Sequence, residues 1–111
     1  MLYRDRYFAK DLESFGWQET VFQESKPIWI MNYYGFMISN KAKSEEVYGF
    51  LRKAMRLVEE ARPFRGCSDL EEKDYEYRDE SKGDANRFLG AGKIFFKSEE
   101  VYRLEYHRGK L

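Results

Sequence analysis

The sequence predicts an α+β fold, in which a mainly antiparallel sheet of two pseudo-symmetric three-stranded modules packs against one long amphipathic helix that connects them. Three observations lead to this prediction. Apolar positions recur after 73 residues, alternating segments flank short polar turns, and one central stretch has helical periodicity. Because no Ser/Gly-rich linker divides the 111 residues, we expect a single domain over residues 1–111.

The duplication becomes visible when the sequence is shifted by 73 residues against itself. Residues 15–33 then align with residues 88–106 without a gap, and residues 3–5 align with residues 77–79 after one inserted residue. The matched pairs are Phe15/Phe88, Val21/Ile94, Phe22/Phe95, Ile28/Val101, Trp29/Tyr102, Met31/Leu104 and Tyr33/Tyr106. We therefore predict an internal repeat over residues 3–36 and 77–109.

Each copy is expected to contain three strands. They span residues 2–8, 17–23 and 28–37 in the first copy and 74–78, 93–97 and 100–107 in the second, with tight hairpins at 24–27 and 97–100. Since side chains alternate along a strand, Trp29, Met31 and Tyr33 share one face, and so do Tyr102, Leu104 and Tyr106. These two faces are predicted to form the core.

The segment between the copies has apolar residues at spacings of three and four, from Val47 to Ala61. Ser44 is the expected N-cap and Pro63 is the expected stop, which gives a helix over about 44–62. If the ancestral unit was a helix followed by three strands, the first copy lacks its helix, and apolar surface is left uncovered. We therefore expect a homodimer.

Composition narrows the classes of function. Lys+Arg and Asp+Glu both total 20, so no strong positive field would recruit nucleic acid or an anionic membrane. Cys67 is the only cysteine and no signal-peptide core follows Met1, which favours a cytoplasmic protein. No apolar stretch is long enough for a membrane span. One histidine and one cysteine do not make a standard metal site, and no cofactor is predicted.

A longer pattern carries a family resemblance. Its parts are Phe15-x-x-x-Glu19-x-Val21, Trp29-Ile30-Met31-Asn32-Tyr33-Tyr34-Gly35, Arg65-Gly66, Gly83-Asp84, Phe88-x-Gly90 and Val101-Tyr102-x-Leu104-x-Tyr106-His107. Over nearly the whole chain, this pattern resembles an uncharacterised bacterial and archaeal family of unknown function. Its members look like stand-alone small proteins or domains appended to helix-turn-helix regulators of the XRE type, which implies a sensory or accessory role. Gly92 departs from the pattern, because the family's second copy tends to carry an acidic residue there.

The candidate ligand-binding residues are Glu19, Trp29, Tyr33, Tyr34, Arg65, Tyr106 and His107. Glu19 is either a carboxylate placed among rings in a pocket or an edge residue that is solvated or paired with an arginine. Arg65 either clamps a carboxylate or phosphate or pairs with the acidic loop that follows it. His107 has no nucleophile or acid at a recognisable spacing, so no catalytic residue is predicted.

The aromatic residues make up 18% of the chain, and such rings need a core or a ligand to cover them. The cluster of Trp17, Trp29, Tyr33, Tyr34, Tyr102 and Tyr106 is either core or dimer interface, or it lines a cleft between the copies; stacking on single-stranded nucleic acid is disfavoured by the neutral charge. We expect a small-molecule-binding or sensory module of regulatory type. The alternative is a structural or protein-interaction domain that forms a homodimer through its aromatic surface. An enzyme ranks third.

Overall fold

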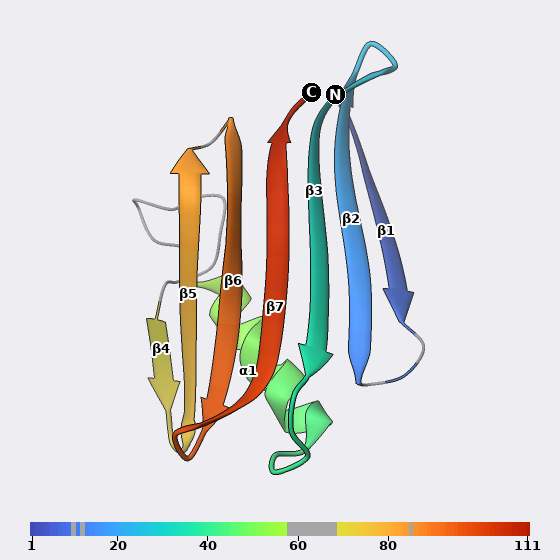
Figure 1. The fold of residues 1–111 in the computed structure, drawn as a ribbon. Coiled ribbons are helices and arrows are strands. Elements are labelled where there is room, and N and C mark those ends of the chain that lie inside the picture. The colour runs from blue at the N-terminus through green and yellow to red at the C-terminus, as the bar shows by residue number, and fades with distance from the viewer. Residues whose placement is uncertain (10, 12, 58–68, 85) are drawn as a thin grey trace.

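The computed structural model describes residues 1–9, 11, 13–57, 69–84 and 86–111 (Figure 1). The elements in these residues are β1 (Leu2–Ala9), β2 (Ser14–Gln23), β3 (Lys26–Met37), α1 (Ser44–Arg56), β4 (Asp69–Glu72), β5 (Tyr75–Asp84), β6 (Arg87–Phe96) and β7 (Glu99–Lys110). The described strands form one antiparallel sheet of seven strands in the order β1-β2-β3-β7-β6-β5-β4. The predicted α+β class is confirmed.

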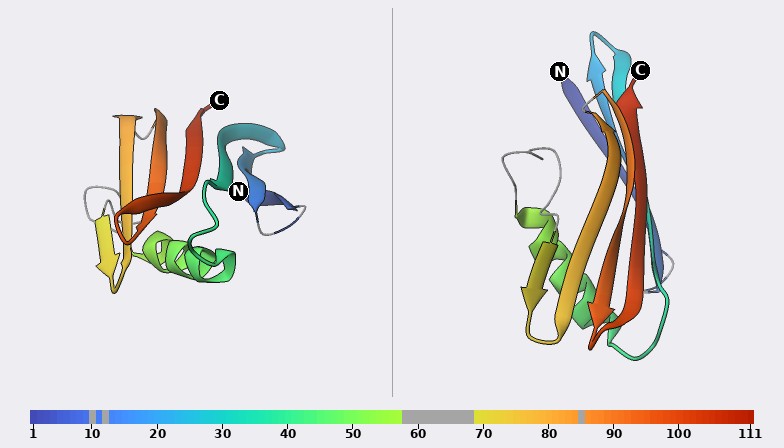
Figure 2. Two further views of the ribbon diagram at one scale, coloured as in Figure 1. Left: turned by 60° about the horizontal axis from the view of Figure 1, so that its bottom comes forward. Right: turned by 60° about the vertical axis from the view of Figure 1, so that its left-hand side comes forward.

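The helix α1 covers one face of the sheet, near the end at which β3 stops (Figures 1 and 2). Its side chains contact this face directly, since the Tyr48 ring lies 5.3 Å from that of Tyr102 and the Phe50 ring lies 5.4 Å from that of Tyr75. We call this side of the sheet the helix face. The opposite side, which carries Asn32 and Tyr34 among other residues, is called the open face.

The core lies between α1 and the helix face. Its buried members are Phe15, Met31, Tyr33, Ala42, Val47, Phe50, Leu51, Ala54, Tyr77, Phe88, Ile94, Val101, Tyr102, Leu104 and Tyr106. The core faces predicted for β3 and β7 are therefore confirmed for Met31, Tyr33 and the three residues of β7. Trp29 is half-buried and packs against the same cluster. Apolar residues of α1 reach this cluster because they recur every three or four positions.

The ends of α1 differ from the prediction. Lys43 is the N-cap and makes no side-chain capping bond, so Ser44 is the first helical residue and its predicted capping role is wrong. The helix ends at Arg56 because Leu57 has an extended backbone, and residues 58–62 of the predicted helix lie outside the described residues. No helix in the described part of the chain is long and apolar enough to cross a membrane.

Several strands extend beyond the predicted bounds, and β4 was not predicted at all. The β4 segment, residues 69–72, has three acidic residues around Leu70, so it lacks the β-branched and aromatic residues that indicate a strand. It forms because its backbone pairs with β5, where Leu70 lies opposite Tyr77 and packs against the core. Tertiary pairing overrides local propensity at this edge.

The two halves of the sheet have equivalent hairpins. Glu24 and Ser25 have φ angles of 51° and 67°, and Lys97 and Ser98 have φ angles of 49° and 67°. Positive φ at both central residues is typical of the type I′ turns that match strand twist. The β2–β3 register shifts between Val21 and Phe22, and the β6–β7 register shifts between Ile94 and Phe95. Each of these features recurs after 73 residues, which supports the proposed internal repeat.

Candidate functional site

The candidate site residues are distributed over both faces of the sheet. Glu19, Trp29, Tyr33 and Tyr106 belong to the helix face, whereas Tyr34 and His107 belong to the open face. Arg65 lies outside the described residues, as does Cys67. The side chains of the described candidates therefore lie on two opposite sides of the sheet.

On the helix face, Tyr33 and Tyr106 are buried and pack against other rings. The Tyr33 ring stacks on that of Trp17 with centroids 5.1 Å apart, and the Tyr106 ring meets that of Phe88 edge-on at 5.9 Å. Aromatic pairs at such distances stabilise a core beyond the area that they bury. The core interpretation of the aromatic cluster thus holds for these two tyrosines.

The most buried carboxylate of the described residues is Asp79, which was not predicted from the sequence. Asp79 is 6% exposed, and it accepts hydrogen bonds from the hydroxyls of Tyr106 at 2.7 Å and Tyr77 at 3.1 Å. Gly92 leaves room for this network, because a Cβ there would lie 2.7 Å from the Tyr77 hydroxyl oxygen. The burial of Asp79 could have been predicted from strand alternation, because Tyr77 and Asp79 are two residues apart and therefore share the helix face of β5.

Glu19 lies near the outer edge of the sheet. It is half-buried on β2, opposite Asp5 of β1, and it is not enclosed by the rings of the core. Partial desolvation of the exposed Tyr3, followed by the charges and hydrogen bonds of Glu19 and Asp5, raises the pKa of its hydroxyl above the usual range. Glu19 therefore lies one strand in from the edge strand β1, and a tyrosine is one of its partners.

The open face contains a broad groove with a volume of about 1300 Å³. The open-face residues that line it are Asn32, Tyr34, Arg78, Glu80, Lys82, Leu89, Ala91, Lys93, Phe95, Arg103, Glu105 and His107, which come from β3, β5, β6 and β7. We call this feature the open-face groove. Four of the candidate residues line it: Tyr34 and His107 belong to the open face, and Tyr33 and Tyr106 are their neighbours on the same two strands.

The part of the groove around Asn32 and His107 combines exposed apolar side chains with polar ones. Tyr34 is 55% exposed and Leu89 is 58% exposed, although both lie on strands of the sheet. His107 is paired with Asn32 on β3 and with Leu89 on β6. The Asn32 side-chain oxygen accepts a hydrogen bond from the Gln18 amide at 2.8 Å, which fixes the Asn32 amide group. This region offers an apolar surface beside fixed hydrogen-bonding groups.

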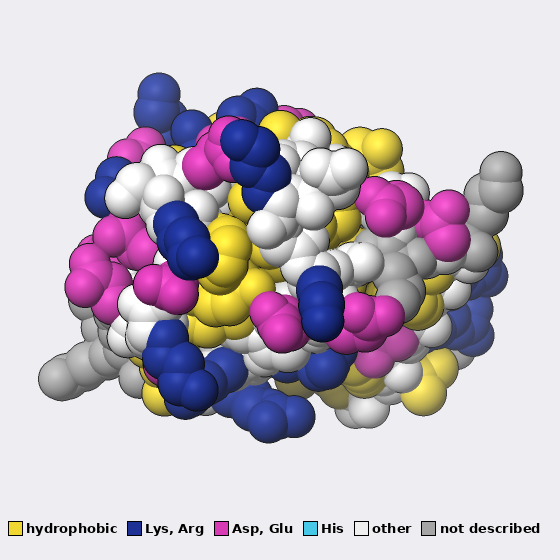
Figure 3. Space-filling view, turned by 90° about the horizontal axis from the view of Figure 1, so that it is seen from below, with side chains coloured by type: hydrophobic (Ala, Val, Ile, Leu, Met, Phe, Trp, Pro, Cys, Tyr) yellow, Lys and Arg dark blue, Asp and Glu magenta, His cyan; other side chains and the backbone are white. Residues whose placement is uncertain are grey.

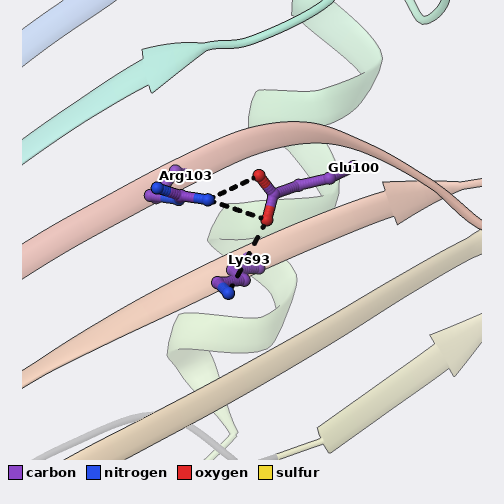
Figure 4. Close-up of polar contacts among 3 residues, drawn as sticks. All are labelled: Lys93, Glu100 and Arg103. Atoms are coloured by element: carbon purple, nitrogen blue, oxygen red, sulfur yellow. Dashed lines mark hydrogen bonds and ion pairs between the residues drawn. The ribbon is translucent and has the colours of Figure 1, made fainter.

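One end of the groove carries three cations in register on neighbouring strands. Arg78 of β5 lies opposite Lys93 of β6, which lies opposite Arg103 of β7. We call these three residues the cation row. The carboxylate of Glu100 accepts hydrogen bonds from Arg103 Nη2 at 2.8 and 3.2 Å and lies 3.8 Å from Lys93 Nζ (Figure 4). Glu100 is thus shared between two members of the row.

The charges elsewhere are mixed. At the end of the sheet where β3 stops, Lys and Arg side chains are interspersed with Asp and Glu around hydrophobic side chains (Figure 3). In the described part of the chain, no group of three or more His, Cys, Asp or Glu side chains is placed to hold a metal ion. The groove itself presents aromatic, hydrogen-bonding and charged side chains.

No curated protein and no solved structure matches this chain. A family match covers residues 5–111, which is nearly the whole chain and includes every strand that contributes to the open-face groove. The chain therefore belongs to the family described as a domain of unknown function, DUF5680.

Proposed function

We propose that this chain is a small-molecule-binding module of regulatory or accessory type, and that its ligand binds in the open-face groove. The observation that carries the proposal is the exposure of Tyr34 and Leu89 in the floor of a groove on the side of the sheet opposite α1. Ligand sites are concave and mainly apolar, with a few polar groups that orient the ligand.

The composition of the open face supports this proposal. An antiparallel sheet that faces water on one side usually carries polar residues there. In this sheet, Tyr34 and Phe36 of β3 form a ring pair with centroids 5.3 Å apart, and Leu89 and Phe95 lie on the same face on β6, beyond β7. Apolar side chains gathered in this way are typical of a binding surface. Asn32 and His107 would orient a polar group of the ligand.

The regulatory part of the proposal rests on the family resemblance. Related domains look like accessory parts of helix-turn-helix regulators, in which binding of a small molecule would be coupled to another domain or protein. This part is an analogy between families, whereas the groove is a property of this chain.

An NMR titration tests the binding proposal. We would titrate the ¹⁵N-labelled protein with benzamide, an uncharged ring with one hydrogen-bonding group. We expect shifts in the amides around Asn32, Tyr34 and Leu89, with a Kd on the order of 1 mM. Tyr34→Ala should weaken binding at least about fivefold, which corresponds to the loss of one aromatic contact. Tyr7→Ala, which removes an exposed tyrosine on β1, is the matched control. Shifts that are absent, or that are spread over β1 and α1, would contradict the proposal.

A second function, homodimer formation, is favoured by one specific observation. All residues of β1 are exposed, including Leu2, Tyr3, Tyr7 and Phe8, whose exposed fractions are 54–64%. β1 is also the edge of the sheet, so one side of its backbone has no neighbouring strand in the described structure. Such edges pair readily with another chain. Light scattering of wild type and of a Phe8→Lys variant tests this function.

A further inference from the structure

We infer that the cation row of Arg78, Lys93 and Arg103 is an oxyanion site, which binds the carboxylate or phosphate monoester of a small aromatic ligand. This inference rests on the proposed function, because it assigns a chemical class to the ligand of the open-face groove. The three residues are directly opposed on β5, β6 and β7. All three line the groove.

Repulsion within the cation row destabilises the sheet when no ligand is bound. Directly opposed residues lie about 5 Å apart, and like charges in such pairs are destabilising. Two carboxylates offset part of this repulsion, since Glu100 contacts Lys93 and Arg103, and Glu76 lies 2.5 Å from Arg78 Nε. Asp69 of β4 also lies directly opposite Arg78, so Arg78 has two carboxylates beside it, whereas Lys93 and Arg103 share Glu100. A bound oxyanion would balance the second charge of the Lys93–Arg103 pair, and this is the reason for assigning an anion to the row.

Arg103 is held in place for such a ligand. Both of its hydrogen bonds to Glu100 come from the same nitrogen, Nη2. The guanidinium is thus held in position through this one nitrogen. Arginine binds planar oxyanions through parallel N–H groups, and a fixed guanidinium loses less entropy on binding. Since the strands are about 4.8 Å apart, one oxyanion can contact Lys93 and Arg103 together.

Rings beside the row favour an aromatic ligand. The Arg78 guanidinium lies 5.1 Å from the centre of the Phe95 ring, and Phe36 lies opposite Arg103 on β3. Tyr34, which lines the groove, lies beside Phe36 on the same face of β3, with the two rings 5.3 Å apart. A ligand ring that packs on Tyr34 and Phe36 therefore places a substituent at Arg103 and Lys93.

The neighbouring charges favour a small anion over a polyanion. The next row of the open face, two residues further along the strands, contains Glu80 on β5 and Glu105 on β7. These carboxylates would repel a chain of phosphates that followed the groove. A ligand with one charged group avoids them when that group lies at the cation row.

The test compares benzoate with benzamide, which have the same ring and differ in charge. In ¹⁵N NMR titrations at low salt, we expect benzoate to bind about tenfold more tightly, as one charge-assisted contact supplies. The difference should shrink as salt is added. Phenyl phosphate in a third titration distinguishes the two oxyanions: tighter binding than benzoate assigns a phosphate, and weaker binding assigns a carboxylate.

Charge variants then locate the effect. Lys93→Gln and Arg103→Gln should each lower benzoate affinity much more than benzamide affinity, so that the ratio of the two affinities falls from about ten towards one. Arg6→Gln, which removes a cation from β1 on the same face of the sheet, is the control for net charge and should change neither. Lys93 is 44% exposed in its side chain, so this variant carries the test if Arg103→Gln does not fold.

The outcomes separate the two proposals. If benzamide binds at Tyr34 and benzoate gains no affinity, the oxyanion site is wrong and the binding function stands. If benzoate is favoured equally in wild type, Lys93→Gln and Arg103→Gln, the row is not the site. If neither compound nor phenyl phosphate produces shifts in the groove, both proposals fail.

Discussion

Tyr33 and Tyr106 lie directly opposite each other on β3 and β7, with ring centroids 6.3 Å apart, and they occupy equivalent positions in the proposed repeat. The pairs on either side of them, Asn32 with His107 and Tyr34 with Glu105, are related by the same equivalence. A local two-fold axis therefore passes between the two tyrosines. The contacts around them differ, because Tyr106 donates a hydrogen bond to Asp79 whereas Tyr33 stacks on Trp17.

The Asp79 network is expected to stabilise the second half of the sheet. Asp79→Asn removes the charge that accepts the Tyr77 and Tyr106 hydrogen bonds, and bonds to charged groups contribute about 1.5–3 kcal/mol. We expect the free energy of unfolding in urea to fall by about this amount. Glu80→Gln, at the adjacent exposed position, should change it by less than about 0.5 kcal/mol. Equal stability of the two variants would contradict this role of Asp79.

Gly90 is expected to be required by the ring of Tyr106. A Cβ at Gly90 would lie 2.6 Å from the backbone oxygen of Glu80 and would overlap the Tyr106 phenol. The backbone of β5 cannot move away without breaking its hydrogen bonds to β6. Gly90→Ala should therefore lower the free energy of unfolding by about 2–3 kcal/mol. Gly49→Ala is the matched control, because nothing lies within 4 Å of its Cβ, and it should raise helix stability by about 0.5–1 kcal/mol. If Gly90→Ala had a higher melting temperature than Gly49→Ala, Gly90 would not be required by the ring of Tyr106.

The sequence was informative wherever a local pattern determined the structure. The hairpins at residues 24–25 and 97–98 and the buried faces of β3 and β7 followed from turn residues and alternation. The same alternation places Tyr33 and Tyr34 on opposite faces, so the sequence alone was sufficient to divide the candidate residues between two sides of the sheet. β4 was missed because its strand depends on pairing with β5 and not on its own residues.

The cation row could not be predicted from the sequence. Arg78, Lys93 and Arg103 become neighbours only through the registers of two strand pairs. The register between β6 and β7 also depends on the irregularity between Ile94 and Phe95. A displacement of one residue would move the β7 side chains to the other face of the sheet. Long-range register is therefore the information that the sequence pattern lacked.

Two half-buried tyrosines, Tyr48 and Tyr75, predict a loss of stability at high pH. Burial, followed by the charge of Tyr7, raises the pKa of Tyr48 to about 12. In the unfolded chain, tyrosine ionises near pH 10. The folded state thus retains a proton that the unfolded state has lost between about pH 10 and 12, so stability falls as pH rises through this window.

Tyr48→Phe tests this dependence. Urea unfolding at several pH values from 8 to 11 should show a less steep loss of stability for the variant than for wild type, because one ionisable group has been removed. Tyr75→Phe should act in the same direction, since burial and the hydrogen bond to Glu46 raise the pKa of Tyr75 to about 12. Identical slopes for wild type and both variants would show that these hydroxyls do not control alkaline stability.

The edge strand β1 predicts association of two copies. Leu2 and Phe8 lie on the open face and Tyr3 and Tyr7 on the helix face, so both faces of this edge carry large exposed side chains. Antiparallel pairing of β1 with the β1 of a second copy would satisfy the free backbone groups and extend the sheet across a two-fold axis. Natural sheets block such pairing with charged residues at the edge; β1 has Arg4, Asp5 and Arg6 at its centre but large apolar side chains at both ends.

Phe8→Lys introduces such a charge and should therefore prevent association. We expect light scattering at micromolar concentration to give the mass of two chains for wild type and of one chain for Phe8→Lys. Tyr34→Ala, which removes an exposed ring from the open-face groove, is the matched control and should remain a dimer. A wild-type protein that is monomeric at these concentrations would exclude β1 as a dimer interface. A Tyr34→Ala variant that is monomeric would instead place the interface on the open face, where it would compete with the proposed ligand.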